Sequence, residues 1–201
     1  MKALLSAATL ALGLTVTTAD AQLLQKLEDA VTGPPTQAQV AAARQEVQDA
    51  AAQALVALYA VAPNARRAVE SAAGYAAFST FGMKLMVAGG TSGKGLAVNQ
   101  RTRAQTYMKM LQVQGGLGFG INKNQMIFVF TSDQALADFI NQGWEFGAQA
   151  NVSAMAGGEG EMFSGAAAIS PGVYLYQITE TGLSATLTVS GTRFFVDADL
   201  N

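Results

Sequence analysis

The sequence predicts an α+β fold: a mostly antiparallel, curled β-sheet, barrel- or sandwich-like, packed with N-terminal helices and one internal helix. Three helical patterns lie before residue 74, and short apolar runs rich in aromatic and β-branched residues follow, separated by Gly and Asn. No strand–helix–strand alternation repeats along the chain. Strands therefore dominate, and the helices are segregated from them.

Residues 1–21 have the pattern of a secretory signal peptide. Lys2 precedes an apolar stretch over residues 3–16, and Ala19-Asp20-Ala21 matches a small-residue cleavage site. The apolar stretch is too short to span a bilayer, and no cysteine follows it to carry a lipoprotein anchor. We expect cleavage before Gln22 and an exported protein, periplasmic if the source is Gram-negative and peripheral to the membrane.

The next segment, residues 22–62, is predicted to be helical. A short amphipathic stretch over residues 22–31 ends at Gly33-Pro34-Pro35, because proline cannot continue a helix. A long helix is expected over residues 37–60, with an apolar stripe that packs on the sheet. We expect residues 63–201 to form a domain that packs with this segment as a single globular unit.

Within residues 63–201, Pro63 begins a short helix over residues 64–73, which Gly74 ends in a left-handed conformation. Ser132 caps a second helix over residues 133–141, which Gly143 ends. We expect a polar loop at residues 99–103 and a hairpin turn at Asn122-Lys123-Asn124. Strands are expected at about residues 75–81, 84–88, 95–99, 106–113, 116–121, 125–131, 144–155, 172–179, 183–190 and 192–196.

The composition excludes several kinds of chemistry. The sequence has no cysteine and no histidine, so histidine-based triads, cysteine nucleophiles and ordinary zinc sites are absent. Glu159 and Glu161 form either a carboxylate pair or part of a solvated loop. The glycines around Lys94 resemble a phosphate-binding loop, but no helix follows. We expect a protein that is not an enzyme and binds no cofactor, metal, nucleotide or nucleic acid.

The charges are divided unequally along the chain. No acid lies between Ser71 and Ser132, whereas residues 133–201 hold eight acids and a single base, Arg193. Two interpretations remain open: a face suited to anions, or a fold in which the two halves interleave and their charges pair.

Gly116, Gly118 and Gly120 recur at every second residue. In a strand these three share one face, which then lets another element or a ligand approach the backbone closely.

Five stretches, in order and spacing, resemble the SYLF domain, also called the Ysc84-like lipid-binding domain, from about residue 63 to residue 195. The matching stretches are residues 73–78 (AGYAAF), residues 89–98 (GGTSGKGLAV), residues 116–120 with 125–131, residues 132–139, and residues 146–158 (FGAQANVSAMAGG). The sequence departs from the family pattern at residues 106–109 (TYMK) and at Glu159 and Glu161, which replace a basic position.

The resemblance implies binding to anionic phospholipid or to a membrane surface. The candidate lipid-binding cations are Arg66, Arg67, Lys84, Lys94, Arg101, Arg103, Lys109 and Lys123. Exposed apolar side chains beside them, such as Met83, Leu85, Met108 and Met110, either insert into the membrane or belong to the core.

The alternative is a structural or protein-interaction module of the cell envelope that uses the same surface. Replacing Arg101 and Arg103 by glutamate distinguishes the two, because it should abolish liposome binding and spare a neutral protein interface.

Overall fold

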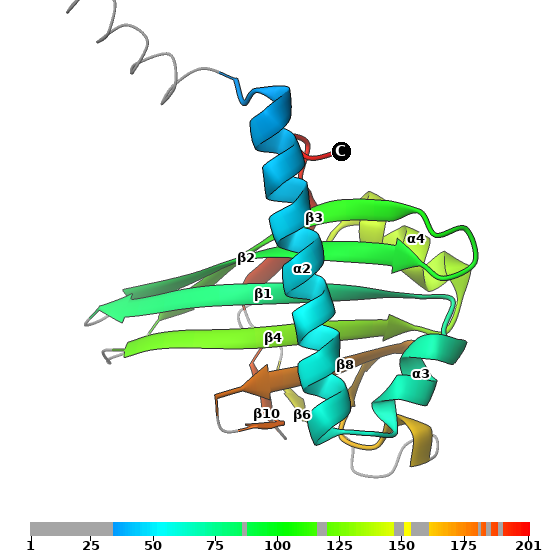
Figure 1. The fold of residues 1–201 in the computed structure, drawn as a ribbon. Helices are drawn as coiled ribbons and strands as arrows, with labels where there is room; N and C mark the ends of the chain where they lie inside the picture. The colour runs from blue at the N-terminus through cyan, green and yellow to red at the C-terminus, as the bar shows by residue number, and fades with distance from the viewer. Residues whose placement is uncertain are drawn as a thin grey trace, which may run out of the picture. The chain divides into compact units, whose positions relative to one another are not determined.

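The computed structural model describes residues 34–85, 88–115, 120–146, 151–153, 161–180, 182–183, 186–188 and 191–201. Within this part of the chain, Gln37–Asn201 forms one compact unit. Its helices are α2 (Gln37–Val61), α3 (Ala65–Ser71) and α4 (Asp133–Gln142), with one 3₁₀ turn, η1 (Glu161–Phe163) (Figure 1).

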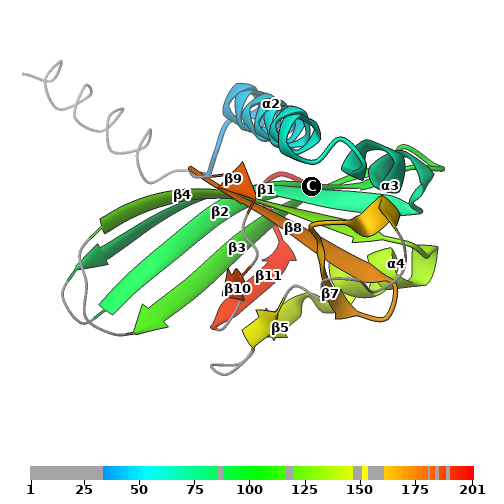
Figure 2. The same cartoon turned by 90° about the horizontal axis from the view of Figure 1, so that it is seen from below.

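The centre of the unit is one curled antiparallel sheet, as the sequence predicts. Its strands run in the order β5-β11-β3-β2-β1-β4-β8-β7, with β9 paired to β8 (Figure 2). A separate small sheet joins β6 to β10. The bounds are β1 (Gly74–Leu85), β2 (Ala88–Asn99), β3 (Gln105–Gly115), β4 (Gly120–Phe130), β5 (Trp144–Phe146), β6 (Asn151–Ser153), β7 (Ala167–Ser170), β8 (Val173–Thr179), β9 (Gly182–Leu183), β10 (Thr186–Thr188) and β11 (Thr192–Val196).

Helix α2 crosses one face of this sheet, which we call the α2 face (Figure 1). Along α2, the buried residues Val47, Ala51, Ala54 and Leu58 recur at helical spacing. They pack on strand residues of the same core, including Ala77, Leu96, Val98, Ile127 and Val129. Small alanine side chains let the helix lie close to the sheet.

The opposite face, which we call the α4 face, holds an aromatic core. Phe78, Phe128, Phe139 and Phe194 are fully buried there and contact one another at ring-centroid distances of 4.9–6.2 Å. Alternate residues of each strand thus enter different cores, as the two-residue period of a strand requires. Both faces are buried where α2 and α4 cover the sheet.

Helix α4 begins and ends where the sequence predicts. The hydroxyl oxygen of Ser132 accepts a hydrogen bond from Ala135 N at 3.2 Å, and Gly143 follows the helix with a positive φ of 63°. The Ser132 cap is predictable from the sequence because it is a hydrogen bond within the first turn of the helix.

Three local predictions are wrong. The separate strands expected at residues 75–81 and 84–88 are not found, because β1 runs unbroken from Gly74 to Leu85. Asn122-Lys123-Asn124 is not a turn but lies inside β4, paired with residues 80–82 of β1. Gly74 does not end α3 in a left-handed conformation. Instead, it begins β1, where an added Cβ would lie 2.6 Å from both Leu136 Cδ2 and Val98 O. A glycine is needed at position 74 because Leu136 and Val98 pack closely against it, and not because the chain turns there.

The glycines of β2 differ in the space around them, which generates a stability prediction. An added Cβ at Gly95 would lie 2.3 Å from Phe78 Cδ1, in the centre of the aromatic core, whereas at Gly90 the nearest atom is Gln112 O at 3.8 Å. We expect Gly95→Ala to lower the free energy of unfolding by about 1–3 kcal/mol through overpacking.

Gly90→Ala is the matched control in the same strand and should change this free energy by less than about 0.5 kcal/mol. Urea denaturation of both variants measures the difference. Equal effects of the two substitutions would contradict the packing argument.

Candidate functional site

Strands β1, β2 and β4 extend beyond α2 on the side away from α3, and their outer half is not covered by that helix (Figure 1). Strand pairing aligns the side chains there in rows. One row on the α2 face runs Gln125, Ser79, Lys94, Lys109 and Phe195, and the next runs Lys123, Phe81, Ser92, Leu111 and Arg193.

Among the described side chains of this outer α2 face, three large apolar ones are exposed to solvent. Phe81 is 45% exposed, Leu111 is 53% exposed and Val113 is 75% exposed. Leu111 and Val113 follow each other on one face of β3, and Phe81 lies in the same row as Leu111, separated only by Ser92. We call these three residues the apolar patch.

A groove of about 530 Å³ lies between α2 and the strands, and Phe81 and Leu111 of the patch line it. Its walls are mostly apolar, and small residues of β1 and β2 occupy the middle. The lining residues are Glu46, Val47, Ala50, Ser79, Thr80, Phe81, Ser92, Gly93, Lys94, Lys109, Met110, Leu111, Lys123 and Phe195.

The three lysines of the groove differ in their partners. Lys94 Nζ lies 3.5 Å from Glu46 Oε2, and both side chains are largely exposed, so this pair is weak. Lys109 Nζ contacts Asp197 Oδ1 at 2.8 Å and Asp199 Oδ2 at 3.0 Å. Lys123 is exposed and has no acid within 4 Å among the described side chains. Lys123 is thus the lysine of the groove that the described residues leave uncompensated.

Lys109 belongs to a clamp formed by the C-terminal residues. Asp197 is buried, and Asn201 hydrogen bonds to both main-chain groups of Tyr107, accepting from N at 3.0 Å and donating to O at 2.8 Å. Arg44 Nε of α2 donates to Leu200 O at 2.8 Å. The clamp joins β3, α2 and the chain end, and so fixes one end of the groove.

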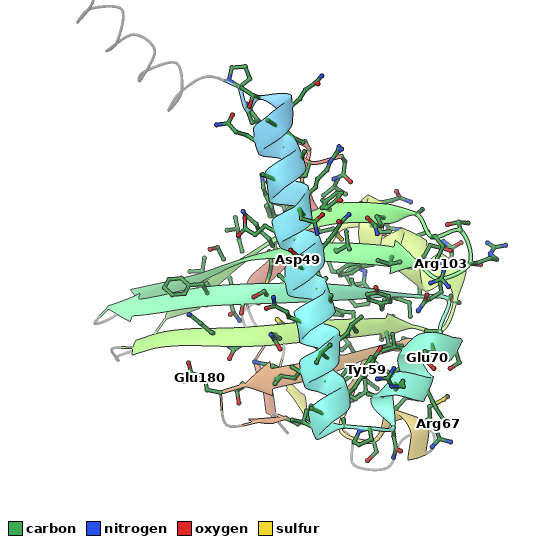
Figure 3. The ribbon with its side chains drawn as sticks, viewed as in Figure 1. Asp49, Tyr59, Arg67, Glu70, Arg103 and Glu180 are labelled. Atoms are coloured by element: carbon green, nitrogen blue, oxygen red, sulfur yellow. The ribbon has the colours of Figure 1, made fainter. Side chains whose placement is uncertain are left out.

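The other predicted cations lie elsewhere. Arg66 pairs with Glu70 on α3 and stacks over the ring of Tyr59, and Arg101 contacts Asp133 at 2.9 Å. Figure 3 places Arg67 and Arg103 at the α3 end of the sheet, and Arg103 donates to Gln100 Oε1. The predicted cations therefore do not form one face, and several of them pair with acids.

Several other predicted residues are corrected or lie outside the described part. Met108 and Met110 are each 1% exposed and belong to the α4-face core, so they do not insert into a membrane. Gly120 begins β4. Gly116, Gly118 and Glu159 lie outside the described residues, as do the side chains of Met83, Lys84, Leu85 and Glu161.

The sequence interpretation missed the apolar patch, although a signal for it exists. In MKMLQVQ (residues 108–114), methionines and Gln112 alternate with Lys109, Leu111 and Val113. Both phases of this strand contain apolar residues, so alternation alone does not say which phase faces solvent.

The shifted pKa values of the described residues have structural causes. Burial raises the pKa of Tyr176 to about 12 and also raises the pKa of Tyr59 and Tyr75.

No cluster of three metal-ligating side chains occurs within the described ranges, and no helix there is long and apolar enough to cross a bilayer. The groove offers ammonium groups, hydroxyl groups and apolar walls, which suit binding.

These features define the class: an α+β domain built on one curled antiparallel sheet, with its candidate binding surface where α2 leaves that sheet uncovered. Residues 111–201 match the family model described as "Ysc84: Las17-binding protein actin regulator". The chain thus belongs to the Ysc84, or SYLF, family through this domain, and the resemblance found in the sequence is confirmed.

A relative supports the same assignment. Over 147 residues, or 73% of this chain, the sequence is 34% identical to "Beta cell expansion factor A" of Aeromonas veronii. The alignment covers 54% of that protein, so the chain spans about half the length of this relative.

The clamp generates a prediction about pH. The hydrogen bonds to Asp197 and then to Asp199 raise the pKa of Lys109 above its usual value of 10.5. A lysine whose pKa is raised by folding stabilises the native state below its unfolded pKa, and this stabilisation is lost as the pH rises through the folded pKa.

We expect Lys109→Met to lower the free energy of unfolding by about 1–2 kcal/mol between pH 7 and pH 10, a value reduced by the partial exposure of the ammonium group. The difference from the wild type should shrink above pH 10.5. Urea denaturation across this pH range measures it, and a difference that stays constant up to pH 12 would argue against an ionic contribution of Lys109.

Proposed function

We propose that the domain binds the surface of anionic membranes through the outer α2 face. The observation that carries the proposal is the apolar patch of Phe81, Leu111 and Val113 beside Lys94 and Lys123. Exposed apolar side chains rimmed by cations are typical of membrane-contacting surfaces. Membership of the Ysc84 family supports a lipid-binding or actin-regulator-like domain.

The proposed contact combines two forces. Each cation close to an anionic surface contributes about 1 kcal/mol, and this attraction weakens with salt. The patch adds an apolar contribution, since its side chains leave water when they enter the interface. In this proposal the domain is a non-catalytic module of an exported protein, which meets lipid at the envelope.

A second candidate function is binding to a protein partner. The family description names Las17 binding, which is a protein interaction, and an exposed apolar patch serves that role equally well. The two functions differ in their dependence on lipid charge, which the following experiments measure.

The first experiment reverses the charges of the groove. We expect Lys94→Glu with Lys123→Glu to weaken binding to vesicles that contain 30% phosphatidylglycerol by at least tenfold, because both cations lie beside the patch. Arg67→Glu with Arg103→Glu is the matched control, since it changes the net charge equally at the α3 end of the sheet. Reversing Arg101 and Arg103 is thus no longer expected to abolish binding, because neither residue lines the groove. Co-sedimentation at low and high salt is the measurement.

Equal loss in the two double variants would assign the binding to net charge and contradict the proposed face. Absence of wild-type binding to both anionic and neutral vesicles would favour the protein-partner function.

The second experiment tests the apolar patch. Leu111→Ser with Val113→Ser should weaken vesicle binding by roughly tenfold, since it removes about 1–2 kcal/mol of apolar insertion. Val56→Ser is the control, because Val56 is 69% exposed on α2 and does not line the groove. Unchanged binding by the double serine variant, measured by the same sedimentation, would refute insertion of β3.

A further inference from the structure

We propose that the groove between α2 and the outer sheet binds one single-chain anionic amphiphile, such as a long-chain carboxylate. The inference rests on the proposed function in that it takes lipid as the ligand class met by this face. It goes further, because it assigns an open groove that holds one ligand molecule, in addition to a surface contact.

The size and lining of the groove suit an alkyl chain. Its volume of about 530 Å³ lies within the range of about 300–1,000 Å³ that is usual for small-molecule sites. Val47 and Ala50 form the α2 side, while Leu111 and Phe195 form the far end on β3 and β11. An alkyl chain in this space would remove apolar surface from water on both sides, which is the main source of affinity for such a ligand.

The middle of the groove is kept open by small residues. Ser79 of β1, Ser92 of β2 and the neighbouring Gly93 line it. Both serine side chains are small and remain exposed, which shows that no larger side chain fills the space between α2 and the strands above them. A large residue at either serine would project into the groove, because both lie on the α2 face.

The charges place the headgroup at the β1–β4 end. Lys109, the direct cross-strand partner of Lys94, is held by Asp197 and Asp199, and an anion bound at Lys109 would lie beside those two carboxylates. Lys94 pairs with Glu46 through a long and exposed contact, and Lys123 has no acid within 4 Å among the described side chains. Glu180, which follows β8 beside β4, comes within 4 Å of neither lysine.

Lys94 and Lys123 are able to share one headgroup. They flank β1, and strand spacing puts their Cα atoms about 10–12 Å apart, a separation that two flexible lysine side chains close onto one anion. The hydroxyl of Ser79 lies between them in the same row as Lys94. The alkyl chain then runs beneath the flank of α2 toward Leu111 and Phe195.

The test titrates the full chain with sodium dodecanoate below its micelle concentration, by isothermal calorimetry. We expect one bound dodecanoate per chain, no binding of acetate, and at least tenfold weaker binding of dodecyltrimethylammonium, which has the same chain and the opposite charge. Lys123→Gln should weaken dodecanoate binding about three- to tenfold and leave the cationic amphiphile unaffected.

Filling the groove provides the decisive variant. Ser92→Trp should weaken dodecanoate binding at least tenfold, and Ser79→Trp is a second variant if the first does not fold. Ser170→Trp is the matched control, because Ser170 is an exposed strand serine on β7 that does not line the groove.

The outcomes separate this inference from the proposed function. Wild-type protein that sediments with anionic vesicles but does not bind dodecanoate would overturn the groove and leave the membrane surface standing. Dodecanoate binding without sedimentation would support the groove and overturn the surface function. Equal affinity for both amphiphiles would overturn the headgroup assignment, and equal loss in Ser92→Trp and Ser170→Trp would overturn the site.

Discussion

The size of a helix relative to a strand is the constraint on which the rest of this structure depends. The twelve residues of β1 span about 40 Å, whereas a helix lying across them is only about 10–12 Å wide. Helix α2 therefore covers only a fraction of the strand length, and the outer half of the sheet keeps an uncovered face (Figure 1). The groove and the apolar patch both follow from this mismatch, since they lie at the edge of the covered region.

The sequence predicts those parts of the fold that local interactions determine. The cap of α4 by Ser132 and the curled antiparallel sheet are confirmed, and the prediction of α2 over residues 37–60 is close to its observed bounds. The turn at Asn122-Lys123-Asn124 fails for a physical reason: residues 80–82 of β1 pair with these residues, and a long-range ladder overrides the turn preference of asparagine. The same pairing places Lys123 on the sheet, where it becomes one of the lysines that line the groove.

The candidate site was less predictable, because charge pairing joins residues that are distant in sequence. Lys109 and Asp199 are ninety positions apart yet in contact, and Arg101 meets Asp133. The sequence left open whether its basic and acidic halves interleave, and for these residues they do. Tertiary packing also decides which alternate residues of β3 face solvent. Met108 and Met110 are buried in the α4-face core, and Leu111 and Val113 therefore lie on the opposite face, where they are exposed.

The pairing of several cations with acids makes the remaining surface more selective than a uniform basic face. An ammonium group held by two carboxylates, such as Lys109, attracts an incoming anion far less than an unpaired one, because the carboxylates repel that anion. Of the groove lysines, Lys123 has no described acid partner, and Lys94 has one exposed partner. A ligand whose charge is held by Lys94 and Lys123 presents that charge on either side of β1 and its apolar part toward Leu111 and Phe195. This polarity distinguishes an oriented amphiphile from a general polyanion, which would gain little from the paired lysine.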